Sequence, residues 1–214
     1  MTTSDNRRWA LFGPLAVALW IGGIILLNHN GPADHSTGSE ILAWYRSNSN
    51  HVIVGGWLFC LGCLSFVSFV AGLRLRFVDA AGRMSQLSAV ALVGAGMAGV
   101  CGMLTALVDL VGAVDKNDID PAIAATLHHS DDLFFIATEL AAVLPLAAIA
   151  IAAWRTGALP RWWAGFAGLV AIVLAVGPIG WLGVIFGLPL FTLGTALIVL
   201  LGPVSRPRAA AAAV

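Results

Sequence analysis

The residues best suited to chemistry are grouped around one short segment. Two adjacent histidines and two adjacent aspartates occur within residues 127–133, directly before an apolar stretch that contains Glu139. The preceding apolar stretch contains Asp109 and ends in the acidic segment 115–120. Imidazole and carboxylate groups bind metal ions and transfer protons. Any chemical site of this chain is therefore expected where these two apolar stretches meet.

A metal site is the first interpretation of this grouping. Imidazole combined with carboxylates suits zinc or manganese, and the candidate ligands are His128, His129, Asp131, Asp132 and Glu139. Their spacing does not match a zinc-protease motif such as H-E-x-x-H. The competing interpretation is a solvated helix end and loop without a ligand. The only cofactor considered is thus a divalent metal held by His128, Asp131 and Asp132.

Asp109 and Glu139 support a second interpretation, in proton or cation handling. Both lie within predicted membrane spans, where acids commonly act as proton relays or cation sites. At 1.5 Å per residue, Asp109 lies about 6 Å and Glu139 about 12 Å from the outer ends of their helices. If one helix continues through Ser130, His128, Asp132 and Glu139 share a face. The alternative is a pair of hydrogen-bonded carboxyls that only hold helices together.

The three cysteines give a weaker signal. Cys60 and Cys63 have the CxxC spacing of thiol oxidoreductases, but an apolar span disfavours the reactive thiolate. Cys101 also lies within a predicted span. We interpret all three as small packing residues. No catalytic residue is predicted, and the closely spaced glycines from 94 to 102 are interpreted as a helix-packing motif and not as a nucleotide site.

The composition identifies the class of protein. Hydrophobic residues make up 59% of the chain and charged residues only 10%, whereas soluble domains contain about 25% charged residues. A transmembrane helix requires about 20 mostly apolar residues. We therefore predict an all-α, polytopic transmembrane bundle that forms a single domain over residues 1–214. Its six spans are expected at residues 9–28, 52–73, 87–113, 132–154, 161–177 and 181–202.

The distribution of positive charge predicts the orientation. Arginine and lysine are enriched in cytoplasmic segments of membrane proteins. With the amino terminus inside, only Arg46 and Lys116 fall outside, while the cytoplasmic segments contain Arg7, Arg8, Arg74, Arg76, Arg83, Arg155, Arg161, Arg206 and Arg208. We expect a multi-pass protein of the cell membrane with both termini cytoplasmic. All five histidines then lie at or beyond the outer surface, and the zero net charge gives no indication of a nucleic-acid partner.

Local signals predict how several helices begin, turn or bend. Ser36 or Thr37 is suited to cap a short helix that lies flat at the membrane interface, with Ile41, Leu42, Trp44 and Tyr45 along one side. Asp120 and Pro121 form an N-cap and first-turn pair for a helix that leads toward His128. Ser130, Asp131 and Asp132 are suited to cap the fourth span. Pro145 is expected to kink that span, and residues 177–180 should form the last turn.

Three short segments carry a resemblance to a known family. They are Glu40-Ile41-Leu42-Ala43-Trp44-Tyr45, Ala71-Gly72-Leu73-Arg74 and Arg155-Thr156-Gly157-Ala158-Leu159-Pro160-Arg161-Trp162. In these segments the chain resembles an actinobacterial family of small six-helix integral membrane proteins of unknown function. The resemblance implies a bacterial cytoplasmic-membrane bundle. It implies no catalytic or binding residue.

The functional prediction follows from the lack of a catalytic set in the sequence. The simplest interpretation is a non-enzymatic accessory, scaffold or sensing subunit in the membrane. The first alternative is a small proton- or cation-coupled transporter that uses Asp109 and Glu139. The second is a membrane-embedded metal-dependent enzyme. The expected partners are the lipid bilayer and either another membrane protein or a second copy of the chain.

Overall fold

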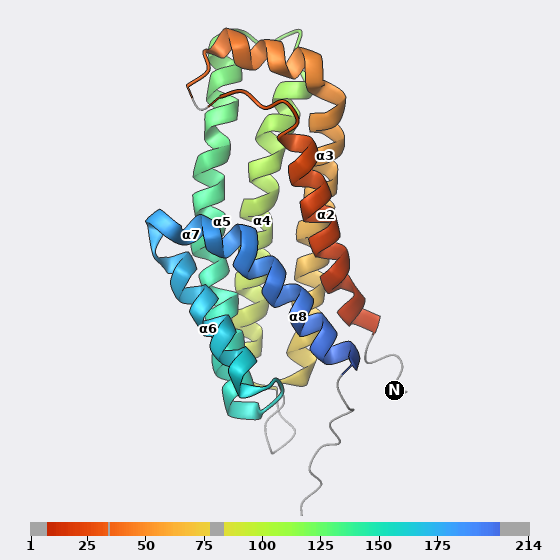
Figure 1. Cartoon of the computed structure of the whole chain (residues 1–214), viewed down its shortest axis with the longest axis vertical. Coiled ribbons are helices and arrows are strands. Elements are labelled where there is room, and N and C mark those ends of the chain that lie inside the picture. Colours follow the sequence, from red (N-terminus) through yellow and green to blue (C-terminus); the bar gives the residue numbers. More distant parts are fainter. Residues whose placement is uncertain (1–7, 34, 78–83, 202–214) are drawn as a thin grey trace, which may run out of the picture.

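The computed structural model describes residues 8–33, 35–77 and 84–201, and the regular elements within these ranges are all helices, joined by short loops (Figure 1). The predicted all-α class is therefore confirmed. In chain order the elements are η1 (Trp9–Leu11), α2 (Phe12–Leu27), α3 (Gly38–Leu73), η2 (Arg74–Arg76), α4 (Gln86–Val114), α5 (Pro121–Thr156), α6 (Arg161–Ala175), η3 (Gly177–Ile179), α7 (Gly180–Leu182), η4 (Gly183–Gly187) and α8 (Leu188–Leu201).

Five helical segments are long and apolar enough to cross a membrane, as a multi-pass membrane protein requires. They are Trp9–Leu27, Gly38–Arg76, Gln86–Val114, Pro121–Thr156 and Gly177–Leu201. The sixth apolar helix, α6, has only 15 residues, whereas a full crossing needs about 20. The predicted turn at residues 177–180 is confirmed, because η3 begins there and connects α6 to the last helices.

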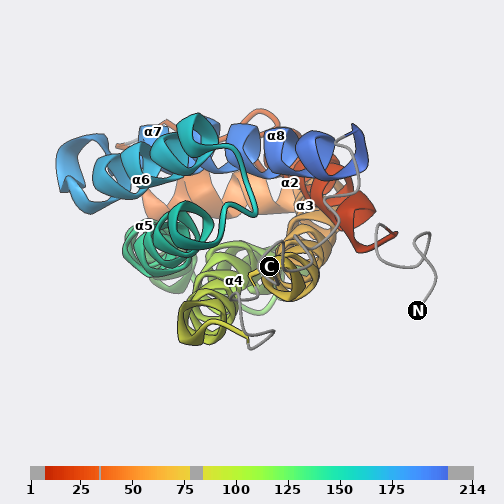
Figure 2. The same cartoon turned by 90° about the horizontal axis from the view of Figure 1, so that it is seen from below.

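The helices form two layers. Seen from below, α3, α4 and α5 make one layer, and α6, α8 and the start of α2 lie across it (Figure 2). In Figure 1, α8 runs diagonally from α7 to the end of α2, so the α6–α8 unit covers only one half of the length of α4 and α5. Helix η1 and the last turn of α8 lie at the same end of the bundle, which we call the termini end. The loops 28–37 and 115–120 lie at the opposite end, which we call the loop end.

Helix α3 begins much earlier than the predicted span at residue 52. Its N-cap is Thr37, whose hydroxyl oxygen accepts from the Glu40 backbone N–H while the Glu40 carboxylate accepts from the Thr37 backbone N–H at 2.7 Å. The predicted cap at Thr37 is confirmed. The helix that it starts is not separate, however, because it continues into α3. Its first turns cross the loop end before α3 bends toward the termini end (Figure 1).

Helix α5 also begins earlier than predicted. The Asp120 carboxylate accepts from the Ile123 backbone N–H at 2.9 Å, which confirms the expected N-cap before Pro121. The helix continues unbroken through Ser130 and Pro145, so the prediction that residues 130–132 cap a new span is wrong. Pro145 remains inside the helix and packs against Gly94 of α4, where an added Cβ would lie 2.6 Å from the proline Cδ.

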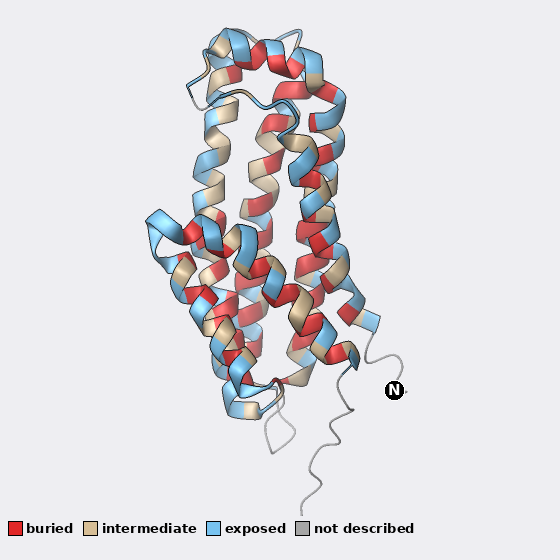
Figure 3. Ribbon diagram, viewed as in Figure 1, coloured by how far each residue is buried: buried red, intermediate tan, exposed pale blue. Residues whose placement is uncertain are grey.

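Buried side chains form a large core between the two layers and a smaller one at the loop end. The smaller core fixes the start of α3 on α4 and α5, and its buried members are Ile41, Leu42, Trp44, Tyr45, Val52, Ala113 and Ala124. Figure 3 shows buried residues on the inward faces of the helices and exposed residues on the outward faces. The outward faces include large apolar side chains such as Trp162, which is 69% exposed. Such surfaces suit contact with lipid.

Candidate functional site

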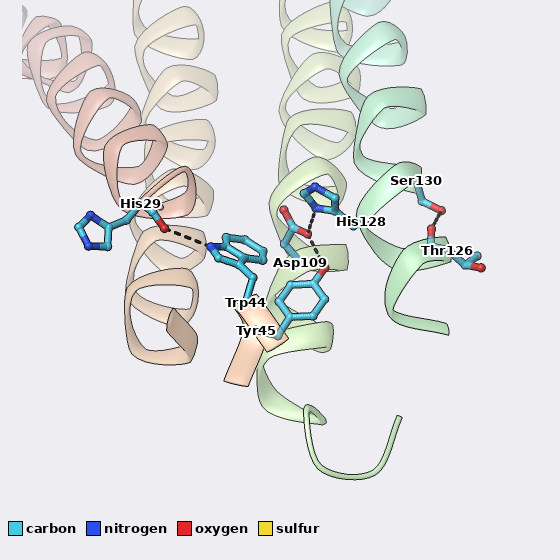
Figure 4. A network of polar contacts seen from close by, with 7 residues as sticks. All are labelled: His29, Trp44, Tyr45, Asp109, Thr126, His128 and Ser130. Carbon is cyan, nitrogen blue, oxygen red and sulfur yellow. Dashed lines mark hydrogen bonds and ion pairs between the residues drawn. The ribbon is translucent and has the colours of Figure 1, made fainter. Parts of the chain in front are cut away.

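Asp109 of α4 is the centre of a buried polar cluster at the loop end (Figure 4). Its Oδ1 atom accepts a hydrogen bond from the Tyr45 hydroxyl at 2.6 Å and lies 3.0 Å from Nδ1 of His128. Tyr45 is fully buried, and Asp109 is only 6% exposed. A single carboxylate oxygen thus joins the first turns of α3, the end of α4 and the first part of α5.

Asp131 brings a second carboxylate to the same place. One ligand atom from each of Asp109, His128 and Asp131 can be chosen so that the three atoms lie within 4.8 Å of one another. His128 and Asp131 are three residues apart on α5 and therefore lie on one face. Ligand atoms around one zinc ion are about 3.4 Å apart for bonds near 2.1 Å. Small side-chain rotations would bring the three groups onto a common cation.

Two glycines allow the first turns of α3 to reach this position. A Cβ added to Gly112 of α4 would lie 2.5 Å from Cε2 of Tyr45, so a side chain there would displace the tyrosine ring. A Cβ added to Gly38 would overlap the carbonyl oxygen of Pro121 at the start of α5. The close approach of the helices at Gly112 and Gly38 places Tyr45 over Asp109.

Trp44 connects the cluster to the loop between α2 and α3. Its indole Nε1 donates to the backbone oxygen of His29 at 3.1 Å. Its ring centroid lies 5.0 Å from that of Tyr45 and 5.6 Å from that of His128. The His29 ring points away from Trp44 in Figure 4 and instead lies 4.4 Å from the His51 ring. Trp44 is therefore in ring contact with two members of the cluster, Tyr45 and His128.

A cavity of about 1020 Å³ extends from the cluster into the bundle. Its polar end is formed by Asp109, His128, His129, Asp131 and Asp132. Farther along, the walls are apolar and include side chains of α2, α3, α4 and α8 such as Val17, Phe66, Ala98 and Leu193. Among the described residues that line it, there is neither lysine nor arginine.

The predicted site residues separate into two groups in the structure. His128 and Asp131 lie together with Asp109, so Asp109 takes the place that the predicted metal set gave to Asp132. Asp132 and His129 line the same cavity without joining the close group. Glu139 is buried elsewhere, against Gly180 of α7, where an added Cβ would lie 2.6 Å from its Oε2. Glu139 is about 16 Å from His128 along α5, so Asp109 and Glu139 have different neighbours.

Tyr45 is the member of the cluster that the sequence did not reveal. Its position beside Trp44 predicts an interfacial aromatic residue, and the cap at Thr37 predicts the helix that carries it. Neither signal indicates that this helix folds over Asp109. The contact depends on the fit of the Tyr45 ring to Gly112, which is a property of the tertiary structure.

The cysteines agree with a packing role. Cys60 and Cys63 are buried and Cys101 is partly buried, and all three are free thiols. Cys60 Sγ lies 3.9 Å from the backbone oxygen of Met103, which makes at most a weak hydrogen bond. Cys63 fills space beside Gly102, where an added Cβ would lie 3.1 Å from its sulfur.

Comparisons with known proteins do not supply a function. A scan against protein-family models, a search of curated proteins and a search of solved structures each found no match to the chain. The resemblance to the actinobacterial family stays a prediction.

Proposed function

We propose that this protein is a non-enzymatic sensing or accessory membrane subunit that binds a divalent cation at Asp109, His128 and Asp131. These three residues, with Tyr45, are called the cation cluster below. The observation that carries the proposal is the convergence of an imidazole and two carboxylates within 4.8 Å, inside the loop end of the bundle. Zinc and manganese are the ions that such a mixed nitrogen and oxygen set favours.

The surrounding charges favour a cation over an anion. Asp132 and His129 also line the cavity, and the described cavity walls contain no basic side chain other than imidazoles. Two basic residues of the loop end make contacts with other partners. The Lys116 ammonium donates to the Ser49 hydroxyl, and Nε of Arg46 donates to the Lys116 backbone oxygen at 3.1 Å. A bound ion with two positive charges would offset the negative charge that the aspartates place near one another.

The position of the cluster supports a sensing role. His128 and Asp109 would exchange their mutual hydrogen bond for bonds to the ion, and Asp131 would turn toward it. Tyr45 and Trp44 contact the same groups from the first turns of α3. Ion binding would thereby alter how these turns and the α2–α3 loop pack on the loop end, where a partner protein or a second copy of the chain can respond.

Two other functions remain as alternatives. A proton- or cation-coupled transporter would use the buried carboxylates of Asp109 and Glu139, although these lie in separate surroundings. A metal-dependent enzyme would use a water on the ion, since three protein ligands leave a coordination position open.

The cellular orientation is part of the proposal. Arg74, Arg76, Arg155 and Arg161 belong to elements at the termini end. By the positive-inside rule this end faces the cytoplasm of a bacterial cell, and the cation cluster faces outward. A cysteine introduced in place of the exposed Asp118 should react with an impermeant maleimide from outside intact cells. Reaction only after the membrane is opened would reverse this orientation.

Metal analysis of the purified full-length protein tests the proposed function. After dialysis against zinc or manganese, the wild type should retain about one ion per chain, as three-ligand protein sites do. Asp109→Asn and His128→Ala should each lose that ion. Asp118→Asn is the matched control, because Asp118 is an exposed acid at the same end but outside the cluster. Equal retention by Asp109→Asn and the wild type would contradict the proposal.

A further inference from the structure

The cavity described above has a polar end and a much longer apolar part. Carboxylates and imidazoles occupy the end next to the cation cluster, whereas Phe66, Leu188 and Leu193 line the interior. Its volume of about 1020 Å³ is at the upper end of the range for pockets that enclose small organic ligands. This division of polarity matches a molecule with one small polar head and a long apolar tail.

The cavity opens sideways, between α2 and the segment formed by η4 and α8. Ile21 and Ile24 of α2 line it and are also 52% and 40% exposed. Phe186 and Leu190 line the opposite wall and are also exposed, at 55% and 57%. Its rim is apolar, so a molecule could enter from the lipid layer without crossing a charged surface.

Trp20 provides an independent indication of a ligand. This residue of α2 lines the cavity and is only 7% exposed, and among the described residues its indole Nε1 has only the weakly accepting sulfur of Cys63 beside it and makes no hydrogen bond of good geometry. A buried donor without a good acceptor is costly. An oxygen atom of a bound molecule would complete its hydrogen bonding.

The charges at the polar end restrict the chemistry of the head group. Asp109, Asp131 and Asp132 present acceptor oxygens, and the described lining residues include no lysine or arginine that would neutralise an anionic head. A phosphate or carboxylate would be repelled, whereas a hydroxyl or an ammonium group can donate hydrogen bonds to these acids.

We propose that this cavity binds a lipid amphiphile that enters from the bilayer and has a hydroxyl or amine head group. The head lies against Asp132, which lines the cavity but is outside the cation cluster, and the tail extends past Trp20 toward Phe66 and Leu193. This inference goes beyond the cation proposal and does not require it, because the side opening, the apolar interior and Trp20 all lie outside the cation cluster.

Photochemical labelling of the full-length protein in phosphatidylcholine nanodiscs tests the proposal. Three probes would carry the same diazirine-bearing tail and differ only in the head: a monoacylglycerol, an alkylamine and an alkyl phosphate. The first two should label cavity-lining residues of α2, α4 and α8, and excess unlabelled monoacylglycerol should suppress this labelling. The alkyl phosphate should label the cavity about tenfold less, as expected for the loss of one charge-assisted hydrogen bond. Preference for the amine over the hydroxyl, or the reverse, identifies the head group.

A matched pair of variants on α2 separates the cavity from general contact with lipid. Ile24→Trp places a large side chain at the opening, whereas Leu15→Trp makes the same kind of change at an exposed position that does not line the cavity. Cavity labelling should fall about tenfold in the first and remain unchanged in the second. Equal labelling by all three probes, confined to outward residues such as Val93 and Leu140, would overturn the proposal. Cavity labelling of the wild type that unlabelled monoacylglycerol does not suppress would also overturn it.

Because these variants lie outside the cation cluster, the two proposals can fail separately. Metal binding by Asp109→Asn does not decide the outcome of the labelling experiment, which is tested by the two variants on α2. Loss of cavity labelling in Ile24→Trp should leave metal retention at the wild-type level.

Discussion

The hydroxyl of Tyr45 donates to the carboxylate of Asp109 at 2.6 Å, although the two residues are 64 positions apart in the chain. Asp109 lies within an apolar helix, where an acid without partners would be costly. The first turns of α3 fold over the end of the bundle and bring the hydroxyl to it, and α5 brings His128 from the other side. The acid is thus supported by two elements outside its own helix.

Tyr45→Phe should therefore weaken the loop end. The substitution keeps the ring over Gly112 and removes only the hydroxyl, which leaves a buried carboxylate with one protein partner fewer. A lost hydrogen bond to a charged group costs about 1.5–3 kcal/mol of unfolding free energy. Thermal unfolding in detergent, followed by far-ultraviolet circular dichroism, would measure the change. Equal stability of Tyr45→Phe and the wild type would show that Asp109 does not depend on this hydroxyl.

Gly112→Ala should disturb the cation cluster by displacing the ring of Tyr45. The new Cβ would lie 2.5 Å from Cε2 of Tyr45, so the ring must shift and its bond to Asp109 lengthen. We expect lower thermal stability and weaker zinc binding, measured by calorimetry on the purified protein. Gly96→Ala is the matched control on the same helix, because an added Cβ there meets nothing within 4 Å. Since alanine is the better helix former, that control should be neutral or more stable by up to about 1 kcal/mol. Equal thermal stability and equal zinc binding of the two variants would show that Gly112 does not position the cation cluster.

Metal binding at the cation cluster should weaken as the pH falls. Histidine ligates metals only in its neutral form, and protons also compete for the aspartates. Zinc affinity of the wild type should therefore drop between about pH 8 and about pH 5.5, and zinc uptake should release protons. In His128→Ala the remaining weak binding should depend less on pH over this interval. Zinc affinity that does not change with pH in the wild type would exclude His128 as a ligand.

Much of the fold follows from local sequence signals. Long apolar stretches predict the membrane-crossing helices, Ser36 or Thr37 predicts the N-cap of a short helix, and Asp120 with Pro121 predicts the start of another short helix. The structure confirms the N-caps at Thr37 and Asp120, but the helices that they start are not short, because they continue into the whole of α3 and α5. The predicted cap at Ser130 is wrong, because a residue suited to an N-cap can also lie inside a continuing helix. There its hydroxyl donates to the Thr126 backbone oxygen at 2.6 Å.

The site was less accessible to sequence reasoning. Spacing along α5 indicates that His128 and Asp131 share a face, but it cannot indicate which residue of α4 or α3 meets that face. The contact between Tyr45 and Asp109 depends on how the first turns of α3 cross the bundle. Likewise, the position of Glu139 beside Gly180 depends on the short helices after α6, which no pattern in the sequence specifies.

Glu139→Gln should show that Glu139 acts independently of Asp109, although the sequence predicted one proton or cation site for both acids. Glu139 packs against Gly180 and lies about 16 Å along α5 from His128. Substitutions that far apart without shared partners act independently, within about 0.5 kcal/mol. Zinc affinity of Glu139→Gln should therefore match the wild type, and the double variant with Asp109→Asn should bind zinc no worse than Asp109→Asn alone. The same variants in proteoliposomes test the transporter alternative, which requires both single substitutions to abolish a proton- or cation-dependent flux. Loss of zinc binding in Glu139→Gln would show that the acids are coupled through the bundle, and the cation cluster would then have to include Glu139.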